Sequence, residues 1–222
     1  MEAAHDSAAN EVAAGSFPKT RHGSILENLS TWTQHPSPSF LLWIVGPRSN
    51  LAHLCADSAG DYLAASYFFL RELQVDDPTR FFTTIAYQLA LHFPTHGELI
   101  DAKLRRSPDL ISKSLKIQFR ELIVQPFQRL RASGEITVGS RRIIIVNGLD
   151  KCKGDQAREE LLRILTTETE ALPFRWVVFT CPDIVVDGQR LGLKFLTLLN
   201  LDAWRLTENG FEDGCCRTDS RV

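Results

Sequence analysis

The sequence lacks long apolar runs and lacks an excess of charge of either sign. Its longest apolar runs, such as residues 40–45, fall far short of the ~18 residues that a membrane-spanning helix requires. Lysine and arginine number 25 and aspartate and glutamate number 27, which gives a formal net charge of -2. A dedicated nucleic-acid binder or an electrostatic membrane anchor would be strongly basic instead. These absences predict a soluble protein that binds neither nucleic acid nor membranes.

Signals of export and of metal binding are also lacking. The first ten residues contain acidic side chains and no apolar segment of the kind that a secretory signal has. The five cysteines are Cys55, Cys152, Cys181, Cys215 and Cys216. They form no CxxC pair, no histidine lies at zinc-ligand spacing from them, and an odd number of cysteines does not describe a disulfide framework. We therefore expect a cytoplasmic protein with reduced thiols and no metal site.

One histidine pair has the spacing of a helical metal site. His92 and His96 are four residues apart, but Pro94 lies between them and would interrupt a helix there. We expect both histidines on the surface, near a helix junction. The aromatic residues at 67–69 and 81–82 are expected to belong to the core, because no basic stripe accompanies them as in a base-stacking platform.

Short apolar runs alternate with amphipathic segments along most of the chain. Runs typical of strands buried on both faces lie at 40–45, 63–70, 143–146, 174–180 and 195–201. Helical periodicity is found at 24–34, 78–91, 95–106, 114–130 and 154–171, with a bend expected at Pro126. This alternation predicts an α/β fold with a parallel β-sheet covered by helices on both faces. Ligands of such sheets bind at the carboxyl ends of the strands, here Gly46, 147–150 and 181–183.

Several segments together resemble a known family. Thr20-Arg21 precede the first helix, Gly46-Pro47 end the first strand, and the later segments read LAASYFF, RFFTTIAYQLA and IIIVNGLDKC. The chain resembles the NACHT-type, nephrocystin-like P-loop domain of fungal STAND signalling ATPases over residues 19–206. Residues 1–18 then form a mobile lead-in and 207–222 a polar tail. The resemblance implies a P-loop NTPase-like fold in which ATP or ADP binds after the first strand and nucleotide exchange drives oligomerisation.

The phosphate-binding loop departs from that family. A P-loop has the pattern Gly-x-x-x-x-Gly-Lys-Ser/Thr, whose glycines, lysine and hydroxyl hold the phosphates and Mg²⁺. Here only Gly46-Pro47 match, the Walker A lysine is missing, and Arg48 is the only nearby cation. Roughly eight residues are absent relative to the family's loop. The fold is therefore expected to be truncated here, with the next helix cut to about two turns and the domain weakly stable or dependent on oligomerisation.

Two further sites of the family have lost charged groups. The resemblance places a Mg²⁺-holding aspartate at Asn147 and a later acid at Lys151, so that only Asp150 of this motif remains. Asp150 either retains a catalytic part or caps the turn and pairs with Lys151 or Lys153. At the end of the fourth strand, Cys181 stands where the family has an arginine that senses the γ-phosphate. Loss of one such electrostatic group already costs ~10²–10³ in rate, so we expect no catalytic residue.

Six residues at the family's nucleotide-site positions are expected to be vestiges of that site. They are Thr20, Arg21, Gly46, Pro47, Asn147 and Asp150. No cofactor is expected, although intact relatives bind ATP or ADP and Mg²⁺. Three functions remain open: an inactive scaffold that joins protein partners, including intact NACHT relatives; a divergent switch that binds ATP or ADP; and a truncated, non-functional copy.

Overall fold

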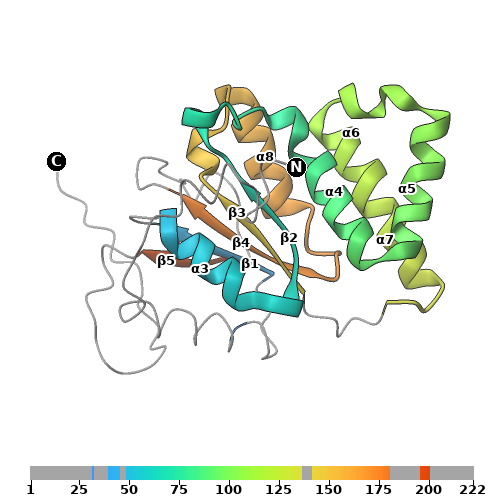
Figure 1. Ribbon diagram of the computed structural model, residues 1–222, viewed down its shortest axis with the longest axis horizontal. Coiled ribbons are helices and arrows are strands. Elements are labelled where there is room, and N and C mark those ends of the chain that lie inside the picture. The colour runs from blue at the N-terminus through green and yellow to red at the C-terminus, as the bar shows by residue number, and fades with distance from the viewer. Residues whose placement is uncertain (1–31, 33–39, 46–48, 137–141, 181–195, 201–222) are drawn as a thin grey trace.

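Five parallel strands form a single sheet in the order β2–β3–β4–β1–β5. A computed structural model describes residues 32, 40–45, 49–136, 142–180 and 196–200 (Figure 1). The strands are β1 (Leu41–Val45), β2 (Leu63–Phe68), β3 (Arg142–Asn147), β4 (Phe174–Thr180) and β5 (Leu196–Asn200). All five were expected from their apolar runs, and the predicted α/β class with a parallel sheet is confirmed.

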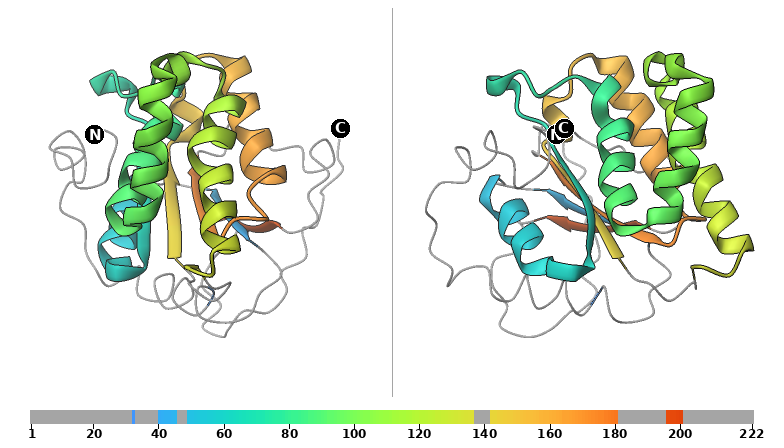
Figure 2. Two further views of the ribbon diagram at one scale, coloured as in Figure 1. Left: turned by 90° about the vertical axis from the view of Figure 1, so that its right-hand side faces the viewer. Right: turned by 45° about the vertical axis from the view of Figure 1, so that its right-hand side comes forward.

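Helices cover both faces of the sheet. Helix α3 (Ser49–Ala59) lies on one face, and the helices that follow β2 and β3 lie on the other (Figure 2). The second group comprises α4 (Phe81–His92), α5 (Pro94–Arg106), α6 (Leu115–Phe119), the π-helix η6 (Arg120–Val124), α7 (Gln125–Ala132) and α8 (Asp155–Thr167). The connection from β1 to β2 runs along the sheet in one direction. The connections from β2 to β3 and from β3 to β4 run in the opposite direction. Because crossovers between parallel strands are right-handed, the two directions place their helices on opposite faces.

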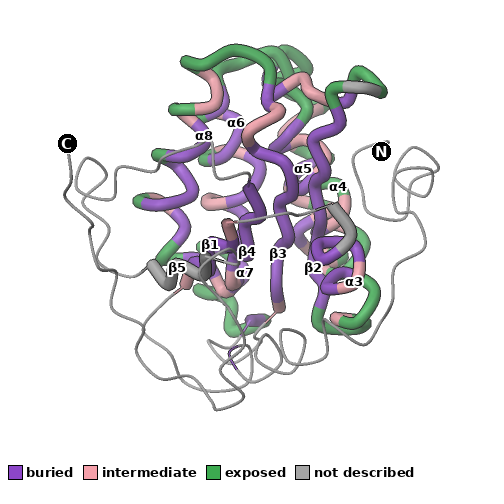
Figure 3. Tube along the Cα trace, turned by 90° about the vertical axis from the view of Figure 1, so that its left-hand side faces the viewer, coloured by how far each residue is buried: buried purple, intermediate pink, exposed green. Residues whose placement is uncertain are grey.

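The strands separate two apolar cores. Successive side chains of a strand point to opposite faces, so Leu42 and Ile44 pack with α3 while Leu41 and Trp43 pack with the α4–α8 side. The central strands are buried along most of their length (Figure 3). The aromatic residues at 67–69 and 81–82 are buried as expected, and the rings of Tyr67 and Phe81 lie 4.9 Å apart. Among the described residues, no helix combines the length and apolarity needed to cross a membrane.

Helix α3 is longer than the sequence led us to expect. We predicted about two turns, but its 11 residues make about three turns at roughly 3.6 residues each. The helix already begins at Ser49, and its side chains Leu51, Ala52, Cys55 and Ala56 form one buried face against the sheet. This face of the sheet is therefore covered. The prediction of a domain that is weakly stable or dependent on oligomerisation was based on a helix of about two turns, and α3 is longer than that.

The other predicted elements differ from the structure mainly at their ends. β2 ends at Phe68, two residues early, because Leu70 turns away to bridge Val75 in antiparallel fashion. The helix predicted at 114–130 is present as α6, η6 and α7, and Pro126 lies next to the π-helical turn. The predicted helix at 24–34, the lead-in 1–18 and the tail 207–222 lie outside the described residues, except for buried Trp32.

A glutamine side chain takes the place of a neighbouring strand at the edge of the sheet. β2 is an edge strand, and its Ser66 presents backbone groups away from β3. Gln88 of α4 donates from Nε2 to the Ser66 carbonyl at 2.8 Å and accepts from the Ser66 N–H at 2.9 Å. The amide thus reproduces the hydrogen bonds of a missing strand and closes this part of the edge.

Replacement Gln88→Ala is expected to lower the free energy of unfolding by about 1–2 kcal/mol, because two part-buried backbone groups lose these partners. Urea unfolding followed by circular dichroism measures the change. Gln128→Ala, at an exposed glutamine of α7, is the matched control and should stay within about 0.5 kcal/mol of the native protein. Equal effects of the two variants would contradict the role of Gln88.

Candidate functional site

The carboxyl ends of β1, β3 and β4 lie side by side at one edge of the sheet. Val45 is paired with Thr180, and Asn147 with Phe179. The ladder between β3 and β4 extends one residue further, because the Gly148 N–H donates to the Phe179 carbonyl at 3.0 Å. This edge is where the sequence predicted a ligand site, and the structure places Asn147 and Asp150 there.

The chain makes a tight turn as it leaves β3. Gly148 has φ +71° and ψ 33°, and a Cβ atom at this position would meet the Phe69 carbonyl oxygen at 2.8 Å. A glycine is required because any side chain would be strained and would also collide with the backbone of β2's end. The short 3-10 helix η7 (Leu149–Lys151) follows, closed by the Lys151 N–H donating to the Gly148 carbonyl at 2.7 Å.

The side chains of this turn differ in their exposure. Asn147 is only 6% exposed, and its Oδ1 has no hydrogen-bond partner among the described residues. Leu149 is fully buried and anchors the turn in the core, whereas Asp150 and Lys151 are half-buried. The aliphatic stem of Lys151 lies beside Gly148. The turn therefore holds the neutral amide of Asn147, and the acidic Asp150 and the cationic Lys151 follow it closely in the chain.

A buried hydrogen bond joins the middle of β1 to the end of β4. The indole N–H of Trp43 donates to Thr180 Oγ1 at 2.9 Å, and both residues are 0% exposed. The Thr180 hydroxyl therefore points into the protein and is engaged there. It offers no surface hydroxyl to a phosphate or a metal ion at the end of β4.

Several predicted site residues lie outside the described part of the chain. These are Thr20, Arg21, Gly46, Pro47 and Arg48, together with the segment 181–183. Of the six residues expected to be vestiges of a nucleotide site, the structure thus brings Asn147 and Asp150 to the carboxyl edge. Within the described ranges, no group of three or more histidine, cysteine, aspartate and glutamate residues could hold a metal ion.

The two described cysteines are not activated thiols. Burial raises the pKa of Cys55 to about 12 and that of Cys152 to about 12. Both thiols are therefore protonated at neutral pH, and a protonated thiol is a poor nucleophile. Both are free rather than joined in a disulfide, in line with the reduced thiols expected from the odd number of cysteines.

The prediction for the histidine pair was half wrong. Pro94 begins α5 two residues after α4 ends, so the expected helix junction is present, and His92 is exposed there. His96, in contrast, is 0% exposed and its Nε2 lies 2.8 Å from the Leu122 carbonyl oxygen. It is buried because the first turn of α5 packs its inner face against η6 and α7. Sequence spacing alone gave no sign of this contact.

A comparison with protein families identifies the domain. The family model described as Nephrocystin 3, N-terminal matches residues 25–180, well over half of the chain. The chain belongs to this family. The nephrocystin 3 N-terminal match runs from before β1 to the end of β4 and includes Gly46, Pro47, Asn147 and Asp150, whereas Thr20 and Arg21 precede it. A comparison with curated proteins gave no match.

Proposed function

We propose that this nephrocystin-like domain does not hydrolyse ATP and acts as a protein-interaction or signalling scaffold. The observation that carries the proposal is Asn147, a neutral and nearly buried amide at the end of β3. Hard cations such as Mg²⁺ are held in proteins mainly by carboxylates and phosphates. A lone amide at this position supplies an oxygen without the negative charge that would hold the metal.

Three neighbouring features support the loss of hydrolysis. Lys151 brings a cation onto the same turn, three residues after Gly148. The Thr180 hydroxyl is engaged with Trp43 in the interior. The sequence that follows β1 lacks the second glycine, the lysine and the hydroxyl of a P-loop. A phosphate cradle, a metal ligand and a balancing acid are thus missing together, and each of them would have to be supplied from elsewhere.

The partners that fit this proposal are proteins of the cytoplasm, including intact NACHT relatives with complete phosphate loops. The near balance of 25 basic and 27 acidic residues gives no electrostatic footprint for nucleic acid or for an anionic membrane. A domain that keeps the family's fold but not its chemistry would associate with such relatives through surfaces that do not depend on nucleotide.

One observation favours a second function, a divergent switch that still binds ATP or ADP. Asn147 Oδ1 is a buried acceptor without a partner among the described residues, and buried polar atoms are usually hydrogen-bonded. A nucleotide-bound water or hydroxyl would satisfy it. The third alternative, a truncated and non-functional copy, predicts neither nucleotide binding nor association with any relative.

We expect ATP and ADP at millimolar concentration, with and without Mg²⁺, to leave the melting temperature of the protein unchanged and to release no phosphate. A true ligand at ~100 times its Kd would add about 2.7 kcal/mol of stability, a rise of roughly 5–10 °C for a domain of this size. Asn147→Asp should not restore binding, because the phosphate loop remains incomplete. A Mg²⁺-dependent rise in the native protein would instead establish the switch.

The scaffold role has its own test. The full chain is mixed with an intact NACHT relative, and the mixture is analysed by size-exclusion chromatography and analytical ultracentrifugation. We expect the two proteins to co-elute, and we expect the amount of complex to be the same whether or not this chain is incubated with nucleotide before mixing. Absence of any association, combined with absence of nucleotide binding, would favour the non-functional copy.

A further inference from the structure

The helix that runs from α6 to α7 contains a π-helical turn just before a proline. In this turn, η6, the Gln125 N–H donates to the Arg120 carbonyl five residues earlier. Pro126 has no N–H, so it cannot donate to the carbonyl of Leu122 four residues earlier or to that of Glu121 five residues earlier. Buried carbonyls need a donor from elsewhere.

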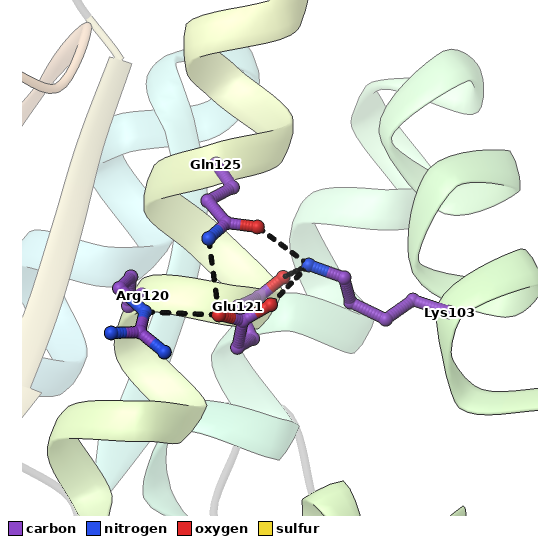
Figure 4. A network of polar contacts seen from close by, with 4 residues as sticks. All are labelled: Lys103, Arg120, Glu121 and Gln125. Atoms are coloured by element: carbon purple, nitrogen blue, oxygen red, sulfur yellow. Dashed lines mark hydrogen bonds and ion pairs between the residues drawn. The ribbon is translucent and has the colours of Figure 1, made fainter. Parts of the chain in front are cut away.

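Two side chains of α5 supply donors to these two carbonyls. His96 Nε2 lies 2.8 Å from the Leu122 carbonyl oxygen, and Lys103 Nζ lies 3.5 Å from the Glu121 carbonyl oxygen. The Lys103 ammonium also donates to the Glu121 carboxylate and, at 2.7 Å, to Gln125 Oε1 (Figure 4). His96 and Lys103 are seven residues apart and so lie on the same face of α5. We call these two contacts the α5 latch.

The two halves of the α5 latch respond differently to pH. The Lys103 ammonium is the main cause that keeps the pKa of Glu121 below its usual value, so this ion pair stays charged in mild acid. Burial lowers the pKa of His96, an effect that the Leu122 carbonyl only partly opposes. The hydrogen bond to Leu122 fixes the ring proton on Nε2, because a carbonyl oxygen can only accept. Nδ1 is therefore the unprotonated nitrogen.

Among the described residues around His96, no hydrogen-bond acceptor faces Nδ1, where a second ring proton would bind. Its ring stacks on Phe127 with centroids 4.7 Å apart, and Nδ1 is buried without a hydrogen-bond partner in the described part of the chain. Charged or titratable groups on the helices packed against α5 are Tyr87 and His92 of α4, Asp109 of the 3-10 helix η5 (Pro108–Ser112), Arg120 and Glu121 of η6, and Arg129 and Arg131 of α7, with Glu135 and Arg142 close by. Tyr87 is exposed, and Asp109 pairs with Lys113. Glu121 pairs with Lys103 and Arg120, Glu135 bonds Thr95, His92 faces Arg142, and Arg129 and Arg131 are exposed.

We propose that the α5 latch is a pH-sensitive conformational device, in which a proton on Nδ1 of His96 expels the ring and releases the first half of α5 from η6 and α7. A charged imidazolium with one N–H facing an apolar site is strongly disfavoured, and moving the ring into water relieves it. The Lys103–Glu121 half keeps holding the end of the helix. Opening thus starts at His96 and uncovers the packed face of Phe127.

The sign of the pH dependence follows from proton linkage. The open state binds the proton with the ordinary histidine pKa of about 6.5, and the closed state binds it less tightly because the ring is buried. The closed latch is therefore fully favoured above about pH 6.5 and weakens as pH falls from there toward the lower pKa of the closed state. One proton changes the opening constant by up to about tenfold per pH unit in this interval.

Hydrogen exchange of the full chain, measured at several pH values between 7.5 and 5.5 and corrected for intrinsic chemical exchange, tests the proposal. Amides in the first half of α5 should open up to about tenfold more often per unit of pH decrease, while those of α8 keep their protection. His96→Gln retains an N–H donor for the Leu122 carbonyl but does not titrate, so it should remove the pH dependence. His92→Gln is the matched control at an exposed histidine and should retain it.

An α5 response that is the same in His96→Gln as in the native protein would overturn the proposal, and so would an equal response in α8. If His96→Gln fails to fold, nuclear magnetic resonance of the native protein with labelled histidine gives the answer. The His96 ring should then carry its proton on Nε2 near neutral pH and titrate together with the opening of α5. A ring that stays neutral while α5 opens would refute the mechanism.

Discussion

Trp43→Ala is expected to lower the free energy of unfolding by about 3–5 kcal/mol, which corresponds to a fall in melting temperature of roughly 6–20 °C. Trp43 is 0% exposed on a strand that pairs with β4 and β5, so the lost volume leaves a cavity in the core between the sheet and the α4–α8 helices. The substitution also leaves the buried Thr180 hydroxyl without its indole donor. Urea unfolding followed by far-ultraviolet circular dichroism measures the loss.

A matched pair of milder variants separates the hydrogen bond from the volume. Trp43→Phe and Trp176→Phe remove the same atoms from two residues that are both 0% exposed. The Trp43 N–H is bonded to Thr180, whereas the Trp176 N–H is buried without a partner among the described residues. Trp43→Phe should therefore be the more damaging, by about 1–3 kcal/mol. Equal losses would mean that the hydrogen bond from Trp43 to Thr180 contributes nothing.

The strands could be predicted because buried strands differ from other segments in their residue composition alone. Strands covered on both faces are continuous apolar runs, and β4 was predicted with the bounds that the structure has, Phe174–Thr180. β2 was predicted two residues too long because Phe69 and Leu70 are as apolar as the strand before them. Their path is set by the bridge from Leu70 to Val75, a pairing that apolar periodicity does not reveal.

The length of α3 was mispredicted because the residues after β1 were compared with a motif that they no longer contain. Counting from the absent phosphate loop gave a helix of about two turns, whereas the spacing of Leu51, Cys55 and Ala56 already describes a longer amphipathic helix. Local periodicity was the better guide here. Periodicity depends only on the residues that are present, and α3 packs its apolar face against the sheet without the family's phosphate loop.

The candidate site was predictable in place but not in detail. Asn147 and Asp150 follow a buried strand, and the carboxyl ends of parallel strands share one edge, so their location follows from topology. The two contacts of the α5 latch and the Gln88 bonds to Ser66 join separate elements whose residues are 18 to 26 positions apart in the chain. One signal was available: a proline inside a long buried helix leaves a carbonyl that requires a donor from another element.

Gly148→Ala is expected to destabilise the protein by about 2–4 kcal/mol, because two separate effects coincide at this residue. A left-handed backbone with φ +71° is unfavourable for alanine, and its Cβ would stand 2.8 Å from the Phe69 carbonyl oxygen. Phe69 cannot move away freely, since its N–H donates to the Asn147 carbonyl at 2.9 Å and continues the pairing of β2 with β3. The variant should therefore loosen the turn that carries Asn147 and Asp150, and chemical unfolding together with hydrogen exchange in β2 and β3 measures it.

Gly134→Ala isolates the backbone contribution to that loss. Gly134 follows α7 with φ +78°, and a Cβ atom there would meet nothing within 4 Å. Alanine at this position should cost only about 1 kcal/mol, the strain of the left-handed conformation alone. The excess at Gly148 is then the cost of the collision with β2's end, and it should appear as faster exchange at the ends of β2 and β3 and not in α7. A loss at Gly148 no greater than at Gly134 would show that the two strand ends can separate without cost, and that the edge carrying Asn147 is not held in a fixed geometry.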